Sequence, residues 1–356
     1  MLNLVFFNLS IFLLLIIGAV FVGSANNFDT KFYKHLLSVF LGLFTFVLIS
    51  LRFIKIEKIV DYSIFFWLIT VGILILNLFI GTTVNGSKSW IYIGNFSFQP
   101  AELTKLSLLF LFLWAMRQLK EKNIFFAFSL ILSCVTILPI FLQPDLGFSV
   151  LLFLTNLIMN YLVGINGFVV TVILLFTVFI GSIVIKPYQL ERLITFMDPY
   201  RDPLGSGWQT IQSVNCIING GLLGQGIGNG MLSKLGFLPE KDTDFIFSLI
   251  TEEVGLIGAT FIIFLFMILI LSIIWVYKNS ELTQNKVISS YVLGIIFVQT
   301  FVNIGMNTMS GPITGLPLPL ISYGGTNMVV TLFLLGIINQ LNFEIYRSNK
   351  IKKWVE

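Results

Sequence analysis

Ten long apolar segments recur from one end of this sequence to the other, and they constrain the fold more than any other feature. A helix needs about 20 predominantly apolar residues to cross a bilayer core roughly 30 Å thick. Charged residues make up only 11% of the chain, against about 25% in soluble domains. The sequence therefore predicts an all-α polytopic membrane protein with about ten transmembrane helices. The segments are 4–23, 36–51, 60–81, 99–116, 124–142, 146–163, 167–185, 245–277, 288–306 and 325–343.

The positive residues predict how the chain is oriented. An even number of spans places both termini on one side, and positively charged short loops are retained in the cytoplasm. One side carries Arg52, Lys55, Lys58, Arg117, Lys120, Lys122, Lys278, Lys286, Arg347, Lys350, Lys352 and Lys353, whereas the short loops of the other carry Lys31, Lys34 and Lys88. This bias of twelve to three predicts that both termini are cytoplasmic.

A long outer loop, residues 186–243, separates the seventh predicted span from the eighth. We interpret it as part of a single transmembrane domain that covers residues 1–356. Its apolar residues recur at near-helical spacing, so we expect short amphipathic helices at the membrane interface rather than an irregular loop. These residues are Trp208, Ile211, Val214, Ile217 and Ile218.

Several kinds of chemistry are excluded by what the chain lacks. It contains one histidine, His35, and two cysteines, Cys134 and Cys216, which supply neither a zinc-ligand spacing nor a Ser-His-Asp triad. The glycine run 224–228 follows no strand and lacks the Gly-Lys-Ser/Thr ending of a phosphate loop, so it does not indicate a nucleotide site. No basic tract indicates nucleic acid.

Two ionisable residues lie at membrane depth in the fourth predicted span. A charge in this position costs on the order of 3 kcal/mol and is therefore paired or functional. Glu102 and Lys105 are three residues apart, a spacing at which helical side chains meet. Two interpretations remain open: the pair neutralises itself and ties this helix to a neighbour, or it contacts substrate.

The other acidic residues of interest gather at the outer surface. Glu252 and Glu253 fall at the outer boundary of the bilayer, and Asp145 precedes the sixth span as an expected helix cap. Apart from Asp61, at the inner end of the third predicted span, no acidic or basic residue falls in the inner half of a span, which argues against a transporter with a site at the midplane. Asp244 precedes the eighth span, where it is either an acid of the first helical turn or a catalytic residue.

The order of several motifs carries a resemblance. The motifs are Gly86-Ser87-Lys88-Ser89-Trp90-Ile91, Gln99-Pro100-Ala101-Glu102-Leu103-Thr104-Lys105, Gln143-Pro144-Asp145-Leu146-Gly147, Asp202-Pro203-Leu204-Gly205-Ser206-Gly207-Trp208-Gln209, Leu238-Pro239-Glu240, Thr243-Asp244-Phe245-Ile246-Phe247, Glu252-Glu253, Gly315-Leu316-Pro317-Leu318-Pro319 and Ser322-Tyr323-Gly324-Gly325. Together they resemble the SEDS family of FtsW- and RodA-type proteins. Gln209 and the run 224–226 are more similar to the division (FtsW) branch than to the elongation (RodA) branch.

The resemblance implies a peptidoglycan glycosyltransferase of the bacterial cytoplasmic membrane that polymerises lipid II at the outer face. It implies a class B penicillin-binding protein as transpeptidase partner, together with other membrane proteins of the division or elongation machinery. Two alternatives stay open, a lipid II flippase and a non-enzymatic scaffold of that machinery.

The resemblance places the family's essential aspartate on Asp244. The reaction inverts the anomeric carbon of the donor, so it needs a general base near the acceptor hydroxyl and positive charge near the leaving pyrophosphate. We expect Asp244 to be the base, with Glu240 and Asp242 raising its pKa. Candidate substrate contacts are Lys105, Glu102, Trp90, Lys88, Asp145, Arg192, Gln209, Glu253 and Ser322. No cofactor is required, although a divalent cation, Mg²⁺ or Mn²⁺, could assist.

Overall fold

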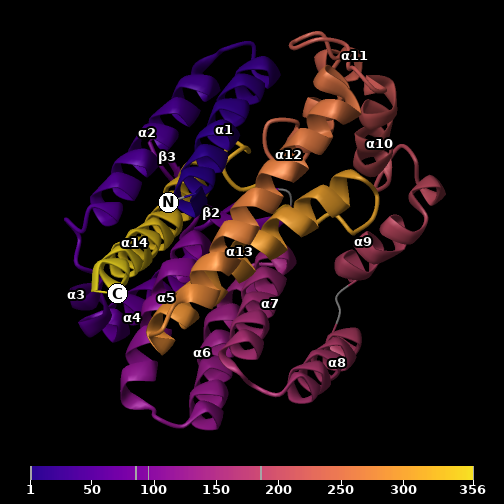
Figure 1. The fold of residues 1–356 in the computed structure, drawn as a ribbon. Helices are drawn as coiled ribbons and strands as arrows, with labels where there is room; N and C mark the ends of the chain where they lie inside the picture. The colour runs from indigo at the N-terminus through magenta and orange to yellow at the C-terminus, as the bar shows by residue number, and fades with distance from the viewer. Residues whose placement is uncertain (1, 85, 95, 185–186, 356) are drawn as a thin grey trace.

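The computed structural model describes residues 2–84, 86–94, 96–184 and 187–355, in which helices dominate (Figure 1). The α-helices are α1 (Leu2–Ala25), α2 (Thr30–Ser50), α3 (Ile56–Asp61), α4 (Ser63–Ile80), α5 (Pro100–Gln118), α6 (Lys122–Leu142), α7 (Leu146–Val163), α8 (Gly167–Val184), α9 (Pro187–Met197), α10 (Trp208–Gly220), α11 (Met231–Lys234), α12 (Ile246–Asn279), α13 (Thr283–Asn307) and α14 (Gly325–Val355). The side chains of Lys350, Lys352 and Lys353, counted above among the inner charges, lie outside the described residues.

Each of the ten predicted apolar segments coincides with a helix. Eight of these helices are long and apolar enough to cross a membrane, namely α1, α2, α4, α6, α7, α12, α13 and α14. The other two are α5, which carries Glu102 and Lys105, and α8, whose apolar part is shorter. The helical class is confirmed, whereas the count of ten spans and their orientation stay predictions.

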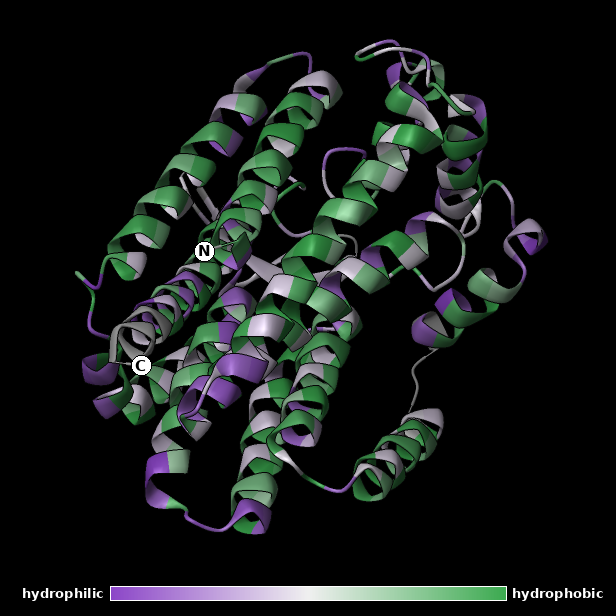
Figure 2. Cartoon of the chain, in the orientation of Figure 1, coloured by the Kyte–Doolittle hydropathy of each residue, from purple (hydrophilic) through white to green (hydrophobic). Residues whose placement is uncertain are grey.

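Hydrophobic residues predominate along the long helices, as the hydropathy colouring in Figure 2 shows, and many of their large side chains are exposed. Phe40 and Phe65 are each 66% exposed, and Phe79 is 74% exposed. A soluble protein rarely exposes apolar surface continuously in this way, because water penalises it. The chain is therefore a multi-pass membrane protein whose outer surface is solvated by lipid.

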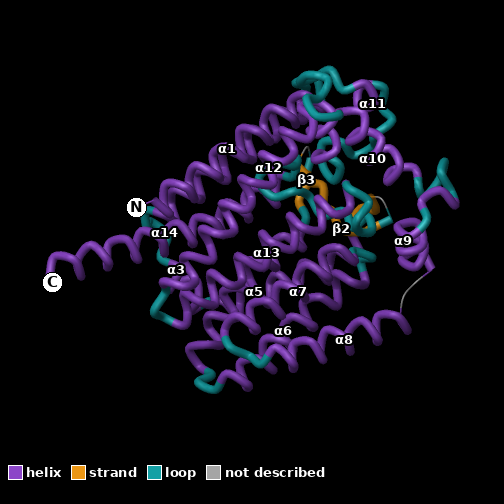
Figure 3. The backbone as a smooth tube through the Cα atoms, turned by 45° about the vertical axis from the view of Figure 1, so that its right-hand side comes forward, coloured by secondary structure: helices purple, strands orange, loops and turns teal. Residues whose placement is uncertain are grey.

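The strands and the long loops gather at one end of the helical bundle, and both ends of the chain lie toward the opposite end (Figure 3). This placement agrees with an even number of crossings. The helices α5 and α13 run through the middle of the bundle, and most of their residues are buried. The polar residues of their outer halves therefore point into protein rather than lipid.

A small β-sheet, which the sequence analysis did not anticipate, occupies the first outer loop. Strands β1 (Thr82–Val84), β2 (Ser87–Ile93) and β3 (Phe96–Phe98) pair antiparallel in the order β1-β2-β3. The residues Trp90, Ile91 and Tyr92 within β2 are of the aromatic and β-branched kinds that favour strands. The sheet is attached to the bundle where the Lys88 backbone N–H donates to the Gln143 carbonyl (3.1 Å).

The long outer loop contains helices, as expected, namely α9, α10 and α11, together with the 3₁₀ turn η1 (Pro199–Arg201). However, α10 turns a small and polar face toward the protein, including Ser213, Cys216 and Gly220. Ile218, one of the apolar residues that predicted the helix, is 71% exposed. This arrangement is suited to an interface helix that rests its polar face on α12 and its apolar face against lipid.

The glycine run 224–228 has a structural role, because it supplies the backbone hydrogen bonds that a break in α12 leaves open. Gly255 has a non-helical φ of 71°, so the carbonyls of Glu252 and Glu253 lose their helical partners. The backbone N–H groups of Gln225 and Gly226 donate to these carbonyls at 3.0 and 2.8 Å. In exchange, the N–H groups that follow Gly255 in α12 donate to carbonyls of residues 221 and 222. The long loop is thereby joined to the helix backbone to backbone.

The orientation can be checked by labelling engineered cysteines with an impermeant thiol reagent. Ser206 is exposed in the long loop, and Asn279 is exposed at the opposite end of α12, whereas Ser280 is buried and unsuitable. Cys134 is replaced by Ala in the background because it is exposed, and Cys216 is buried. We expect intact cells to be labelled at Ser206→Cys and not at Asn279→Cys. The reverse pattern would contradict the orientation and every outer-face assignment that depends on it.

Candidate functional site

The loop that carries Asp244 is held by its backbone. The side-chain amides of Asn303 and Asn307 on α13 donate to the Asp244 carbonyl at 3.0 and 2.9 Å. The Ser322 hydroxyl donates to the Thr243 carbonyl at 2.6 Å. These anchors bind main-chain oxygens, so they hold the loop without engaging the Asp244 carboxylate.

Asp244 is not an acid of the first turn of a helix. Helix α12 begins at Ile246, its N-cap is Phe245, and its first turn contains no acidic residue. The interpretation of Asp244 as an acid of the first turn of α12, stabilised by the helix dipole, is therefore wrong. The alternative, a functional carboxylate in the loop before the helix, remains.

The surroundings of Asp244 bring the pKa of its carboxyl group close to physiological pH. Burial raises the pKa of Asp244 to about 7, and the negative charge of Glu240 adds to this effect. Arg192 opposes the rise in pKa, while Asp145 and Asp242 reinforce it. A carboxylate whose pKa lies near the working pH is well matched to proton transfer.

Asp145 is the second carboxylate of the site and caps α7, as the sequence predicted. Its side chain accepts from the Phe148 backbone N–H at 3.0 Å, and more distantly (3.4 Å each) from Ser89 and Gln99. Burial raises the pKa of Asp145, and the Phe148 and Ser89 hydrogen bonds oppose that rise. The charge of Glu102 raises this pKa further, whereas Arg192 lowers it.

Arg192, on α9, supplies positive charge to both carboxylates. Its charge lowers the pKa of Asp145 and of Asp244, so it lies within electrostatic range of each. One of its guanidinium nitrogens donates to the Ile313 carbonyl at 3.4 Å. The long loop, through α9, therefore places a cation beside the two acids.

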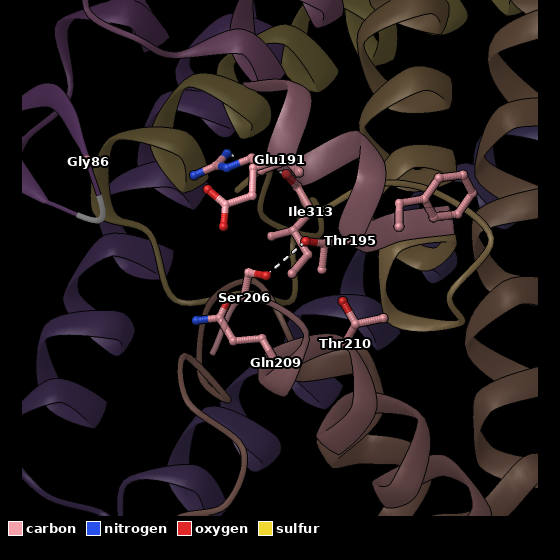
Figure 4. Close-up of a pocket in the computed structure, with 9 residues that line it drawn as sticks. Gly86, Glu191, Thr195, Ser206, Gln209, Thr210 and Ile313 are labelled. Atoms are coloured by element: carbon pink, nitrogen blue, oxygen red, sulfur yellow. Dashed lines mark hydrogen bonds between the residues drawn. The ribbon is translucent and has the colours of Figure 1, made fainter. Parts of the chain in front are cut away.

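A cavity of about 340 Å³ opens beside Arg192, within the size range of small-ligand pockets. Figure 4 shows Glu191, Thr195, Ser206 and Gln209 around it, with Gly86 of the first outer loop at one side. The Thr195 hydroxyl donates to Ser206 at 3.0 Å, which ties α9 to the start of α10. The cavity is lined by Gly86, Glu191, Arg192, Thr195, Phe196, Ser206, Gln209, Thr210 and Ile313.

Glu102 and Lys105 form the expected pair, with 2.8 Å between Lys105 Nζ and a Glu102 carboxylate oxygen. Both side chains are buried, at 0% and 1% exposure. Lys105 Nζ also donates to Gln299 (3.2 Å) and Asn327 (3.1 Å) and lies 5.1 Å from the Phe148 ring centroid. The pair ties α5 to α13 and α14 in the manner of the structural interpretation, and its contact with substrate stays a prediction.

The remaining predicted residues have partners within the protein. Lys88 Nζ donates to the carbonyls of Leu78 and Phe79 at the end of α4, 2.8 and 2.9 Å away. Trp90 is half-buried in β2. Ser322 is buried and also accepts from the Leu318 N–H (2.8 Å). The roles of these three residues in substrate binding stay predictions.

Glu253 belongs to a second cluster of acids on α12. It accepts from the Ser24 hydroxyl at 2.6 Å, which ties α12 to the end of α1. Its neighbour Glu252 accepts from the backbone N–H groups of Leu232 (2.7 Å) and Ser233 (3.1 Å), in the short helix α11. These two acids therefore hold α12 to the end of α1 and to the long loop.

A row of amides on α13 was not predicted from the sequence. Gln299, Asn303 and Asn307 recur every four residues, which places them on one helix face. Gln299 donates to the Pro317 carbonyl at 2.8 Å, and Asn303 to the Leu316 carbonyl at 2.8 Å. A polar stripe at this spacing in an otherwise apolar span was the available signal that this face positions functional loops.

Within the described part of the chain, no group of three or more His, Cys, Asp or Glu side chains is arranged to hold a metal ion. The acids of the site are spread over α5, α7 and the loop before α12 instead.

Residues 1–347 match the FtsW/RodA/SpoVE family, described as "Cell cycle protein". The chain belongs to this family. The resemblance seen in the motifs is thereby confirmed over nearly the whole chain.

Relatives within the FtsW/RodA/SpoVE family carry enzyme names. The chain is 38% identical to the "Probable peptidoglycan glycosyltransferase FtsW" of Wigglesworthia glossinidia brevipalpis, over 96% of this chain and 93% of the relative. It is 34% identical to the "Peptidoglycan glycosyltransferase MrdB" of Escherichia coli K12, over 74% of this chain and 72% of that one.

Among solved structures, one described as "Structural coordination of polymerization and crosslinking by a peptidoglycan synthase complex" has a chain with the same fold. The TM-score is 0.81 at 28% identity, and the match covers 98% of each chain.

Proposed function

We propose that this chain polymerises lipid II into glycan strands at the outer face of the bacterial cytoplasmic membrane. It is a glycosyltransferase of peptidoglycan synthesis. The observation that supports this function best is the Asp244 carboxyl group, whose pKa is about 7, set beside Arg192 at the loop-bearing end of a membrane bundle. A lipid-anchored sugar presents its headgroup at that depth.

In the proposed mechanism, Asp244 acts as general base. Its carboxylate takes the proton from the 4-hydroxyl of the acceptor sugar as the hydroxyl oxygen attacks the anomeric carbon of the donor. The bond from that carbon to the pyrophosphate oxygen breaks with inversion, and the undecaprenyl pyrophosphate leaves with the electron pair. Since an ionised pyrophosphate needs no proton to depart, a single carboxylate suffices.

Arg192 is the cation that we assign to the leaving group. It lines the cavity and lies in electrostatic range of Asp145 and Asp244. Positive charge fixed next to a developing phosphate charge stabilises the transition state. Lys105 is enclosed by protein, and Lys88 donates to the end of α4, so Arg192 is the better-placed cation. A divalent cation, Mg²⁺ or Mn²⁺, stays a proposal as an aid to the leaving pyrophosphate, and the proposed mechanism does not require it.

The proposed partner is a transpeptidase that crosslinks the new strand, of the class B penicillin-binding type, within the division or elongation machinery. Support comes from the structural neighbour, which belongs to a synthase complex that combines polymerization with crosslinking. The division branch remains the favoured assignment for this chain.

The test is to incubate the purified full-length chain with lipid II in detergent, without nucleotide. We expect glycan polymer that a muramidase digests, with one undecaprenyl pyrophosphate released per linkage formed. A parallel sample reconstituted in lipid vesicles separates the alternatives: a flippase would move lipid II across the bilayer without joining it, and a scaffold would do neither. Either of those outcomes, under conditions in which a SEDS enzyme of known activity polymerises, would contradict the proposal.

A further inference from the structure

We propose that Lys31 on α2 is a positioning residue for Asp244, acting through an ion pair with Asp242. This inference rests on the proposed role of Asp244 as the base. It assigns a function in the reaction to the second helix of the chain, to which the motifs gave none.

The geometry joins three separate segments at one point. Lys31 Nζ lies 3.0 Å from a carboxylate oxygen of Asp242. The Tyr323 backbone N–H donates to the Asp242 carbonyl at 2.8 Å, and Lys31 Nζ lies 6.0 Å from the Tyr323 ring centroid. Helix α2, the loop before α12 and the loop before α14 therefore meet at Asp242, two residues from Asp244.

The burial of the pair is unequal, and this decides which partner needs the other. The Asp242 side chain is only 7% exposed, whereas the Lys31 side chain is 56% exposed. A carboxylate so enclosed depends on a counter-charge, while an exposed ammonium is hydrated in any case. Removal of Lys31 therefore leaves the negative charge of Asp242 uncompensated beside the base.

The position of Asp244 is then set from two sides. The amides of Asn303 and Asn307 on α13 hold its carbonyl, and the Lys31–Asp242 pair holds the segment just before it. Lys31 would also act at a distance by charge, because it balances one of the acids that repel a negative Asp244.

Titratable groups from every packed element face these two acids, and apart from Lys31 they are the same in every variant compared. From α2 come Lys31 and His35, from the loop itself Glu240, from the loop before α14 Tyr323, and across the site Arg192 and Asp145. His35 is fully buried, and neither of its ring nitrogens has a hydrogen-bond partner within the described residues. Opposite shifts in the two single variants that cancel in the double variant are therefore attributable to the charges of Lys31 and Asp242.

The experiment is the pH dependence of lipid II polymerisation, measured with the purified full-length chain between pH 5 and 9. The base works when deprotonated, so activity rises with pH through the pKa of Asp244, near 7 in the wild type. For Lys31→Met we expect the acidic limb, the part of the pH–rate profile where activity rises with pH, to shift to higher pH by about 0.5 unit. At a fixed pH on that limb the rate should fall roughly threefold, with KM unchanged. For Asp242→Asn we expect the limb to move down by a similar amount.

The controls separate positioning by charge from general damage. Lys31→Arg keeps the charge and should restore the wild-type limb, and the double variant Lys31→Met/Asp242→Asn should return close to it. Lys234→Met removes a lysine of the same outer face, whose Nζ donates to the Asn229 amide oxygen at 3.1 Å. It should leave the limb in place.

The inference is overturned if Lys31→Met leaves the limb where it was, or if Lys234→Met moves it equally. Should Lys31→Met fail to fold, Asp242→Asn decides alone, since an unchanged limb in that variant also overturns the inference. The parent proposal fails separately, if Asp244→Asn polymerises lipid II like the wild type.

Discussion

Asp244→Asn is expected to lower the rate of lipid II polymerisation by about 10²–10⁴, because loss of a general base typically costs that much. The amide keeps the size of the side chain but cannot accept the proton. The backbone anchors from Asn303, Asn307 and Ser322 bind main-chain oxygens, so the loop should keep its place. Initial rates of polymerisation and the affinity for lipid II, measured on the same preparation, check both statements.

The matched control for this prediction is Asp198→Asn. Asp198 is exposed in the same long loop, makes no side-chain capping bond, and lies apart from the cavity lining. The same change of charge there should leave the rate within about twofold of wild type. A nearly wild-type rate for Asp244→Asn, or an equal loss for Asp198→Asn, would remove the case for Asp244 as the base.

The second large effect is expected from the buried pair of α5. Lys105→Met strands the Glu102 carboxylate inside the bundle, and loss of one partner of a buried pair costs about 3–5 kcal/mol of unfolding free energy. Glu102→Gln should destabilise the fold similarly. The double variant should lose less than the sum of the two single changes, because no lone charge is left. Unfolding in detergent, followed for all four proteins of the cycle, measures the coupling.

A comparison on the same helix calibrates that result. Arg117 pairs with Asp61 at 2.9 Å, but its side chain is 29% exposed and that of Asp61 64%. Exposed ion pairs contribute about 0–1 kcal/mol, so Arg117→Met should change stability little. If the two single changes at 102 and 105 add without coupling, the residues act separately, and Lys105 becomes free for a role with the pyrophosphate.

Some residues of the site could be predicted from the sequence and others could not, depending on whether their contacts lie within one helix or between distant segments. The Asp145 cap and the Glu102–Lys105 pair were predictable because both depend on spacing along one helix. The Lys31–Asp242 junction and the position of Arg192 beside two acids were not predictable. They depend on contacts between segments that lie 211 residues apart in the first case.

The sequence alone determined the membrane class and the approximate position of each long apolar helix, and its motifs supplied the candidate base through the family resemblance. The membrane class and the helix positions follow from local composition and periodicity, since each apolar segment must satisfy its own backbone hydrogen bonds in lipid. Spacing along one chain cannot show which loops meet at the surface of the bundle.

The tertiary structure decided the properties that depend on such meetings. It placed Asp244 before the first turn of α12 rather than within it. It raised the pKa of that group by burial and by the neighbouring acids. It also showed that the glycine run replaces the backbone partners lost at Gly255. Side-chain burial, the electrostatic effect of nearby charges and the exchange of backbone hydrogen bonds all depend on residues that are distant in sequence. Only the folded bundle brings those residues together.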